Sequence, residues 1–170
     1  MSVDVFVANE QSAHAVDCDR WARLAEETLT EEGVRGDAEL SVLFVDSTTI
    51  AALNERFLGR EGPTDVLAFP IDEDDAPIGR SPDNGGSGPG WEPPEPGSLP
   101  SLIGDVVICP EVAFNNAPGH AGTYDDEVAL LVVHGILHLL GMDHENDKEA
   151  QEMEAREQDL LDQLYRKKKR

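Results

Sequence analysis

The sequence is poor in basic residues, in cysteine and in long apolar runs. It holds 13 Lys and Arg residues against 35 Asp and Glu residues, and this net charge of −22 opposes non-specific attraction to nucleic acid or to an anionic membrane. Two cysteines are too few for a disulfide framework, and no apolar stretch approaches the length of a membrane span. The first residues, Met1 to Val7, lack the basic and apolar regions of a signal peptide. We therefore expect a cytoplasmic protein without a membrane anchor.

The pattern of apolar residues predicts a mixture of strands and helices within one domain that spans residues 1–170. Short apolar runs predict strands at 3–7, 40–45, 66–71 and 102–109. Helical spacing and capping residues predict helices at 14–33, at 48–58 after Ser47 as N-cap, from Thr123 to Gly141 and from Asn146 to about Arg166. Together they predict an α+β fold, with a small mixed sheet of about four strands packed against about five helices.

Residues 72–101 lie between the last two predicted strands and differ in composition from the rest. They hold seven of the eleven prolines and six of the fifteen glycines, and they offer almost no apolar side chains. Because such a segment cannot build a core, we interpret it as a flexible acidic insertion on the single domain. A lid over a functional site is the alternative.

Three histidines, His134, His138 and His144, follow one another at spacings of four and six residues. Residues four apart share one face of a helix, so His134 and His138 can direct their imidazoles at one metal ion. Gly141 is placed to end the helix, after which the chain can fold back and bring in His144. Three neutral imidazoles leave one coordination position open, which is typical of a catalytic zinc. We therefore predict one Zn²⁺ per chain.

The helix that carries the first two histidines is apolar on all sides after its first turn, so we expect it to be the central, buried helix. The spacing of the three histidines also occurs in the metzincin peptidases. In those proteins the residue after the first histidine is a glutamate general base, whereas here it is Gly135. A peptidase would need a base from another element, so peptide hydrolysis becomes the secondary hypothesis.

Three segments together carry a family resemblance. They are the run from His134 to His144, the run Pro63-Thr64-Asp65-Val66-Leu67-Ala68-Phe69-Pro70, and the run Gly104-Asp105-Val106-Val107-Ile108. On these segments the sequence resembles the YbeY family of bacterial zinc-dependent, single-strand-specific endoribonucleases, which act in ribosomal RNA maturation. The resemblance implies a zincin-like catalytic domain and a role in ribosome quality control. It also implies single-stranded RNA as substrate, with the ribosome or a small-subunit protein as partner.

One position departs from the family pattern. Many members carry a catalytic arginine where this chain has Leu58, so that role cannot be transferred to this position. Arg60 is the candidate replacement and Arg56 the comparison, although both could be solvated charges at a helix end. Asp143 is a candidate proton acceptor, or else a carboxylate that orients a ligand imidazole or caps a turn. The basic end, residues 166–170, is a solvated tail or an RNA contact.

Two alternative functions stay open at this point. The protein could be a zinc-containing ribosome-assembly factor with little catalysis, or a metzincin-like metallohydrolase of another substrate. The open coordination position favours an enzyme, whereas the absent family arginine favours weak catalysis.

Overall fold

The computed structural model describes residues 3–34, 38–70, 101–142 and 146–166. The strands are β1 (Val3–Asn9), β2 (Ala38–Phe44), β3 (Val66–Pro70) and β4 (Ser101–Ile108). The helices are α1 (Cys18–Glu31), α2 (Ser47–Leu58), α3 (Pro110–Asn116), α4 (Tyr124–Leu139) and α5 (Asp147–Leu160), with a short 3-10 helix at Ala117–Gly119 and a π-helical turn at Leu161–Arg166. The predicted α+β fold is therefore confirmed. The predicted insertion, apart from Ser101, lies outside the described residues.

The four strands form one mixed sheet in the order β1-β2-β4-β3. β1, β2 and β4 run parallel, whereas β3 runs antiparallel to β4 at one edge. Val106, near the middle of β4, pairs with Val42 on one side and with Ala68 on the other. Parallel neighbours need crossover connections, and the helices between the strands provide them.

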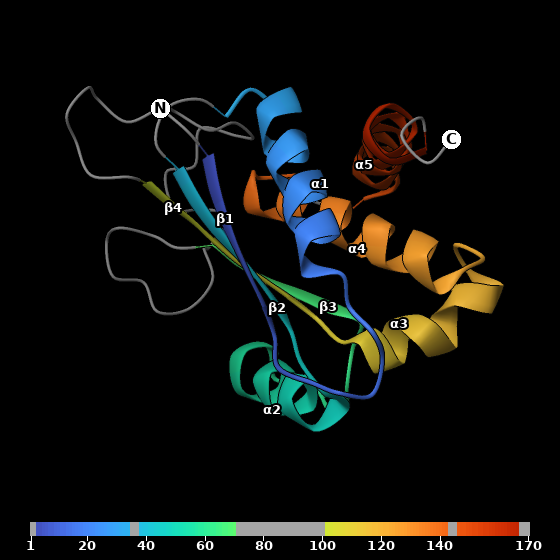
Figure 1. The fold of residues 1–170 in the computed structure, drawn as a ribbon. Helices are drawn as coiled ribbons and strands as arrows, with labels where there is room; N and C mark the ends of the chain where they lie inside the picture. The colour runs from blue at the N-terminus through green and yellow to red at the C-terminus, as the bar shows by residue number, and fades with distance from the viewer. Residues whose placement is uncertain (1–2, 35–37, 71–100, 143–145, 167–170) are drawn as a thin grey trace.

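Helices cover the two faces of the sheet unequally (Figure 1). Leu40, Val42 and Phe44 of β2 point to one face, where they join a large core with residues of α1, α4 and α5. The other face carries a small core in which Ile50 of α2 packs with Val107 and Leu67. Alternate residues of a strand point to opposite faces, so β4 serves both cores.

Two of the predicted helix starts need correction. α1 begins at Cys18 instead of residue 14, because Asp17 is its N-cap and accepts a hydrogen bond from the backbone N–H of Arg20 at 3.2 Å. Ser47 is the first residue of α2 and not its cap. Asp46 is the N-cap, and its carboxylate accepts from the Thr49 N–H at 2.7 Å. In both cases an aspartate immediately before the first helical residue accepts a hydrogen bond from a free N–H group of the first turn.

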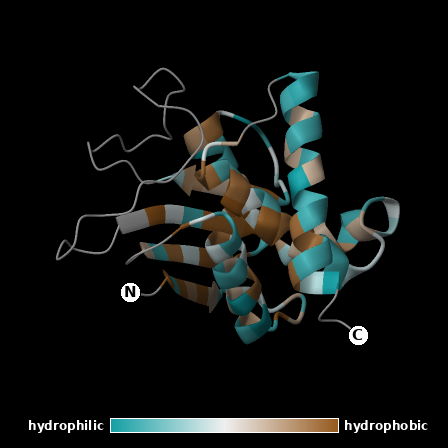
Figure 2. Cartoon of the chain, turned by 90° about the horizontal axis from the view of Figure 1, so that it is seen from above, coloured by the Kyte–Doolittle hydropathy of each residue, from teal (hydrophilic) through white to brown (hydrophobic). Residues whose placement is uncertain are grey.

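α4 is the central helix, as predicted. Thr123 caps it by accepting a hydrogen bond from the Asp126 N–H at 3.1 Å, and ten of its sixteen residues are buried. Figure 2 shows hydrophobic residues concentrated in the interior, whereas the outer helix α5 is largely hydrophilic. Among the helices of the described ranges, none combines the length and apolarity that a membrane crossing requires.

Gly135 explains how closely α4 approaches the sheet. A Cβ atom at this position would lie 2.7 Å from Cγ1 of Val106 on β4, closer than side chains tolerate. The absence of a side chain at Gly135 therefore lets the histidine-bearing end of α4 rest directly on the middle of the sheet.

Candidate functional site

His134 and His138 lie one turn apart near the end of α4, as their spacing predicts. Their ring centroids are 4.6 Å apart and the rings are inclined by 79° to each other. Both residues are partly buried, although their neighbours on the helix are almost all buried. The structure thus brings two of the three predicted metal ligands together on a rigid, buried element.

Gly141 ends α4 in the predicted way. Its φ is +104°, its N–H donates to the carbonyl of His138 at 3.0 Å, and the Met142 N–H donates to the carbonyl of Leu137 at 3.0 Å. This pair of bonds is the Schellman arrangement, which turns the chain sharply at a helix end. Asp143 and His144 follow immediately but lie outside the described residues, so their predicted roles stay predictions.

Glu157 on α5 contacts His134, and sequence reasoning missed it. Its carboxylate oxygen Oε2 lies within hydrogen-bonding distance of Nδ1 of His134, and its side chain is only 9% exposed. A carboxylate accepts only, so Nδ1 carries the hydrogen. The sequence did contain an indication that Glu157 is buried. It is an acidic residue on the same helix face as Met153 and Leu160, both of which are buried.

A second histidine and carboxylate pair joins His120, which precedes α4, to Glu127 in the first turn of that helix. Nδ1 of His120 is 2.9 Å from both carboxylate oxygens of Glu127, whose side chain is fully buried. The backbone N–H of Ala121 also donates to Glu127, at 3.1 Å. The imidazole of His120 is 59% exposed. A buried carboxylate therefore holds an exposed imidazole by one ring nitrogen.

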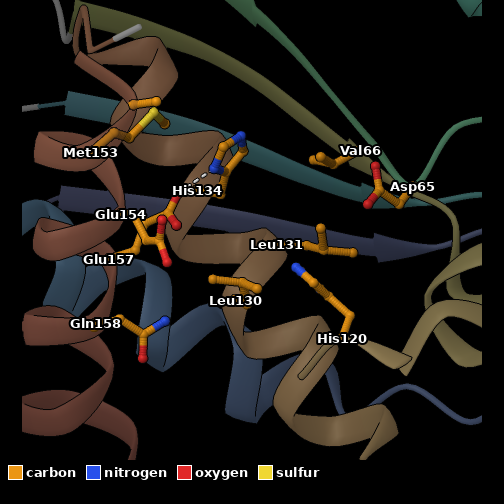
Figure 3. A pocket seen from close by; sticks show the side chains of 11 residues that line it. Asp65, Val66, His120, Leu130, Leu131, His134, Met153, Glu154, Glu157 and Gln158 are labelled. Carbon is orange, nitrogen blue, oxygen red and sulfur yellow. Dashed lines mark hydrogen bonds and ion pairs between the residues drawn. The ribbon is translucent and has the colours of Figure 1, made fainter. Parts of the chain in front are cut away.

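His120, His134 and Glu157 border one cavity of about 370 Å³ between α4, α5 and the start of β3 (Figure 3), whereas Glu127 and His138 are not among the described residues that line it. The described residues that line it are Asp65, Val66, His120, Leu130, Leu131, His134, Ala150, Met153, Glu154, Glu157 and Gln158. Asp65, Glu154 and Glu157 make the cavity acidic. A polyanionic ligand would thus need a cation inside it.

The donor set fits a zinc ion in part. Among the described residues no group of three His, Cys, Asp or Glu side chains is placed to hold a metal. The two imidazoles on α4 supply nitrogen ligands, and the carboxylate on Nδ1 of His134 is the support that metal-bound histidines usually have. Because Glu157 holds Nδ1, Nε2 of His134 is the nitrogen that would bind the zinc ion. The predicted third ligand, His144, is not described.

Comparison with known proteins identifies the family. The chain matches the family Endoribonuclease YbeY over residues 6–165. The chain belongs to this family. An endoribonuclease YbeY from Salinispora tropica is 47% identical over 161 residues, which is 95% of this chain and 94% of that protein. One from Thermobifida fusca is 44% identical over 163 residues, 95% of this chain and 92% of that protein.

The fold has a counterpart among solved structures. The solution structure of TM1509 from Thermotoga maritima matches with a TM-score of 0.60 and 26% identity, over 97% of this chain and 91% of that one. This likeness agrees with the α+β fold described above.

The candidate replacement for the family arginine lies apart from the cavity lining. Arg60 is exposed on the loop after α2, just beyond Gly59, which ends that helix with a φ of +66°. Arg56 is exposed in the last turn of α2, with its guanidinium carbon 5.3 Å from the ring centroid of Phe57. Neither arginine is among the described residues that line the cavity.

Burial raises the pKa of two acidic groups that do not line this cavity, Asp105 and Tyr165. It raises the pKa of Asp105 on β4, against the opposing effect of a hydrogen bond from Ser41. Burial likewise raises the pKa of Tyr165 to about 12, and the phenol donates a hydrogen bond to Asp126 at 3.0 Å. Both groups therefore stay protonated and neutral up to a higher pH than the same groups do in water.

Proposed function

We propose that this protein is a single-strand-specific, zinc-dependent endoribonuclease that acts in ribosomal RNA maturation and ribosome quality control. The nuclease activity is supported by membership in a family named for it, over residues 6–165. The metal dependence is supported by one observation above all. Two imidazoles share a face of a buried helix, and a buried carboxylate on α5 fixes the ring of the first.

His134, His138 and His144 would hold one Zn²⁺. When bound, the ion would polarise a phosphoryl oxygen and lower the pKa of a coordinated water toward neutrality. Glu157 accepts the Nδ1 hydrogen of His134, which selects the tautomer whose Nε2 is a ligand and keeps the ring from rotating. The close contact between α4 and β4 at Gly135 keeps both histidines in place.

The rest of the cavity shapes access to the reacting phosphate. Leu130 and Leu131 lie one turn before His134 on α4, and with Val66 and Met153 they form an apolar wall that limits water around the site. Acidic side chains on the cavity and a net charge of −22 oppose RNA binding. We infer that the ribosome or a small-subunit protein presents the RNA. A ribosomal substrate would place the protein in the cytoplasm.

The geometry disfavours the peptidase hypothesis. In a metzincin the position of Gly135 carries the general base, and here even a Cβ atom would collide with Val106. A glutamate at this position would require α4 or the side chain of Val106 to shift. A peptidase of this fold would need a base from another element.

Metal content and RNA cleavage test the proposal together. The wild type should retain one zinc per chain, and alanine at position 134, 138 or 144 should each reduce it. Wild-type protein should cleave single-stranded RNA oligonucleotides in preference to duplex, lose this activity with chelator, and regain it with added zinc. His138→Ala is the control against a contaminating nuclease. Degradation of casein by a preparation that leaves RNA intact would overturn the assignment in favour of a peptidase.

A matched pair of arginine variants tests the replacement for the family arginine. If Arg60 contacts a phosphate, Arg60→Ala should weaken cleavage while the zinc content stays unchanged. The slope of the logarithm of the RNA-binding constant against the logarithm of the salt concentration should also become shallower by about 0.7. Arg56→Ala is the comparison, because it removes the same charge from the same end of α2. Equal effects of the two variants would argue for a general charge effect.

A further inference from the structure

The cavity holds a second histidine whose chemistry the metal site does not use. His120 precedes α4 and lies on the same cavity as His134, yet it is fourteen residues away along the chain and the zinc ligand set does not include it. In Figure 3 the two imidazoles approach the cavity from different sides, with Leu131 between them. His120 is thus positioned to meet the same bound molecule from another direction.

The contact with Glu127 determines which nitrogen of His120 faces a ligand. Both carboxylate oxygens lie 2.9 Å from Nδ1, so Nδ1 carries the hydrogen and Nε2 is the nitrogen left for chemistry. The Glu127 side chain is fully buried, where an ionised carboxylate is costly unless a positive partner compensates it. A protonated His120 provides that partner and then carries a second N–H on Nε2.

The charged residues around the cavity also single out His120. His120 faces Asp65 before β3, Glu154 and Glu157 on α5 and His134 on α4, and it also borders a second hollow lined by Asp126 and Arg166. Among the described residues that line the larger cavity, His120 is the one group besides His134 that can carry positive charge. An RNA phosphate in this cavity would meet a positive charge at His120 when that imidazole is protonated.

We propose that His120 is a further catalytic residue, the general acid that protonates the leaving oxygen during RNA cleavage, with Glu127 as its positioning residue. This inference rests on the proposed endoribonuclease function. A water oxygen bonds to phosphorus, the bond from phosphorus to the leaving ribose oxygen breaks, and the Nε2 proton of His120 moves to that oxygen. The proton lost by the attacking water returns to His120 through solvent, so the net reaction consumes one water.

RNA with a sulfur in place of the leaving oxygen tests this role, because a thiol has a pKa of about 8.5 and a thiolate leaves without being protonated. The ends of the wild-type products show which bridging position to replace. His120→Ala and His120→Gln should slow cleavage of ordinary RNA by roughly 10²- to 10⁴-fold, the usual contribution of a general acid. On the sulfur-containing RNA both variants should come within a few-fold of the wild type. Glu127→Gln, which preserves shape but not charge, should show a smaller loss with the same recovery.

His14→Ala is the matched control, because His14 is a partly buried histidine that stacks on Phe114 at 4.4 Å and does not line the cavity. It should cleave both substrates at the wild-type rate, and zinc content should be unchanged in every variant. If the His120 variants lost as much activity on the sulfur-containing RNA as on ordinary RNA, His120 would not be the general acid. Undiminished cleavage of ordinary RNA by His120→Ala would have the same meaning. Either result would leave the proposed endoribonuclease function intact. A zinc-loaded wild type that leaves both RNAs uncut would overturn the proposed function and this role with it.

Discussion

Replacing Glu157 with glutamine should weaken zinc binding without removing any zinc ligand. Glutamine keeps the shape and one accepting oxygen of the side chain but removes the negative charge that holds Nδ1 of His134. Hydrogen bonds to charged groups contribute about 1.5–3 kcal/mol. Loss of such an outer carboxylate typically lowers metal affinity 10- to 100-fold, or about 1.4–2.8 kcal/mol. The two ranges agree, so we expect the zinc Kd to rise by roughly 10- to 100-fold.

Competition with a chromophoric zinc chelator measures this change directly. Glu154→Gln is the matched control, because Glu154 lies one turn earlier on α5, lines the same cavity and is exposed. It removes the same charge without removing the contact to the ring of His134. An unchanged Kd in Glu157→Gln would refute the orienting role. A similar rise in Glu154→Gln would show that the cavity's overall charge, and not the contact with His134, sets the affinity.

Three more perturbations follow from the packing and the composition. Gly135→Ala should lower the unfolding temperature, because overpacking costs about 1–3 kcal/mol against a helix-propensity gain of about 1 kcal/mol, and adding Val106→Ala should restore it. Deleting residues 75–96 should leave the circular dichroism spectrum and zinc content unchanged, and a large loss of thermal stability would contradict the insertion hypothesis. Because burial raises the pKa of Asp105, its ionised form is disfavoured in the folded state, so Asp105→Asn should resist urea better than the wild type at pH 7. That advantage should shrink as pH falls through the raised pKa and vanish below about 3.8, and an equal advantage at both ends of a pH series would contradict it.

The features that the sequence predicted best depend on residues close to one another in the chain. The cap at Thr123 needs only the N–H of Asp126, and the turn at Gly141 needs only the carbonyls of the preceding helix. The four strands likewise appear at the predicted apolar runs, with ends displaced by at most two residues. Where an aspartate and a serine compete for one cap, as at Asp46 and Ser47, composition alone does not decide between them.

The supporting carboxylates could not be predicted in the same way, because their partners are set by packing. Glu157 reaches His134 across 23 residues of sequence, only after α5 has docked on α4. Glu127 lies in the first turn of α4, where an acidic residue already has a local explanation in the helix dipole. Its contact with His120 depends on the path of the chain between α3 and α4. Histidine spacing predicts a set of zinc ligands, but it carries no signal for the carboxylates that contact His134 and His120.

Gly135 links the packing of the fold to the placement of the chemistry. Gly135 has no side chain, and a Cβ atom there would lie 2.7 Å from Cγ1 of Val106. The same missing side chain leaves the position without the glutamate that acts as general base in a metzincin. We therefore expect proton transfer at the proposed zinc site to use groups on elements other than the turn of α4 that carries His134 and His138. The described residues offer such groups on α5 and on the segment before α4, where Glu157 and His120 face the cavity. Glycine after the first histidine thus shifts the expected acid and base groups to α5 and to the segment before α4.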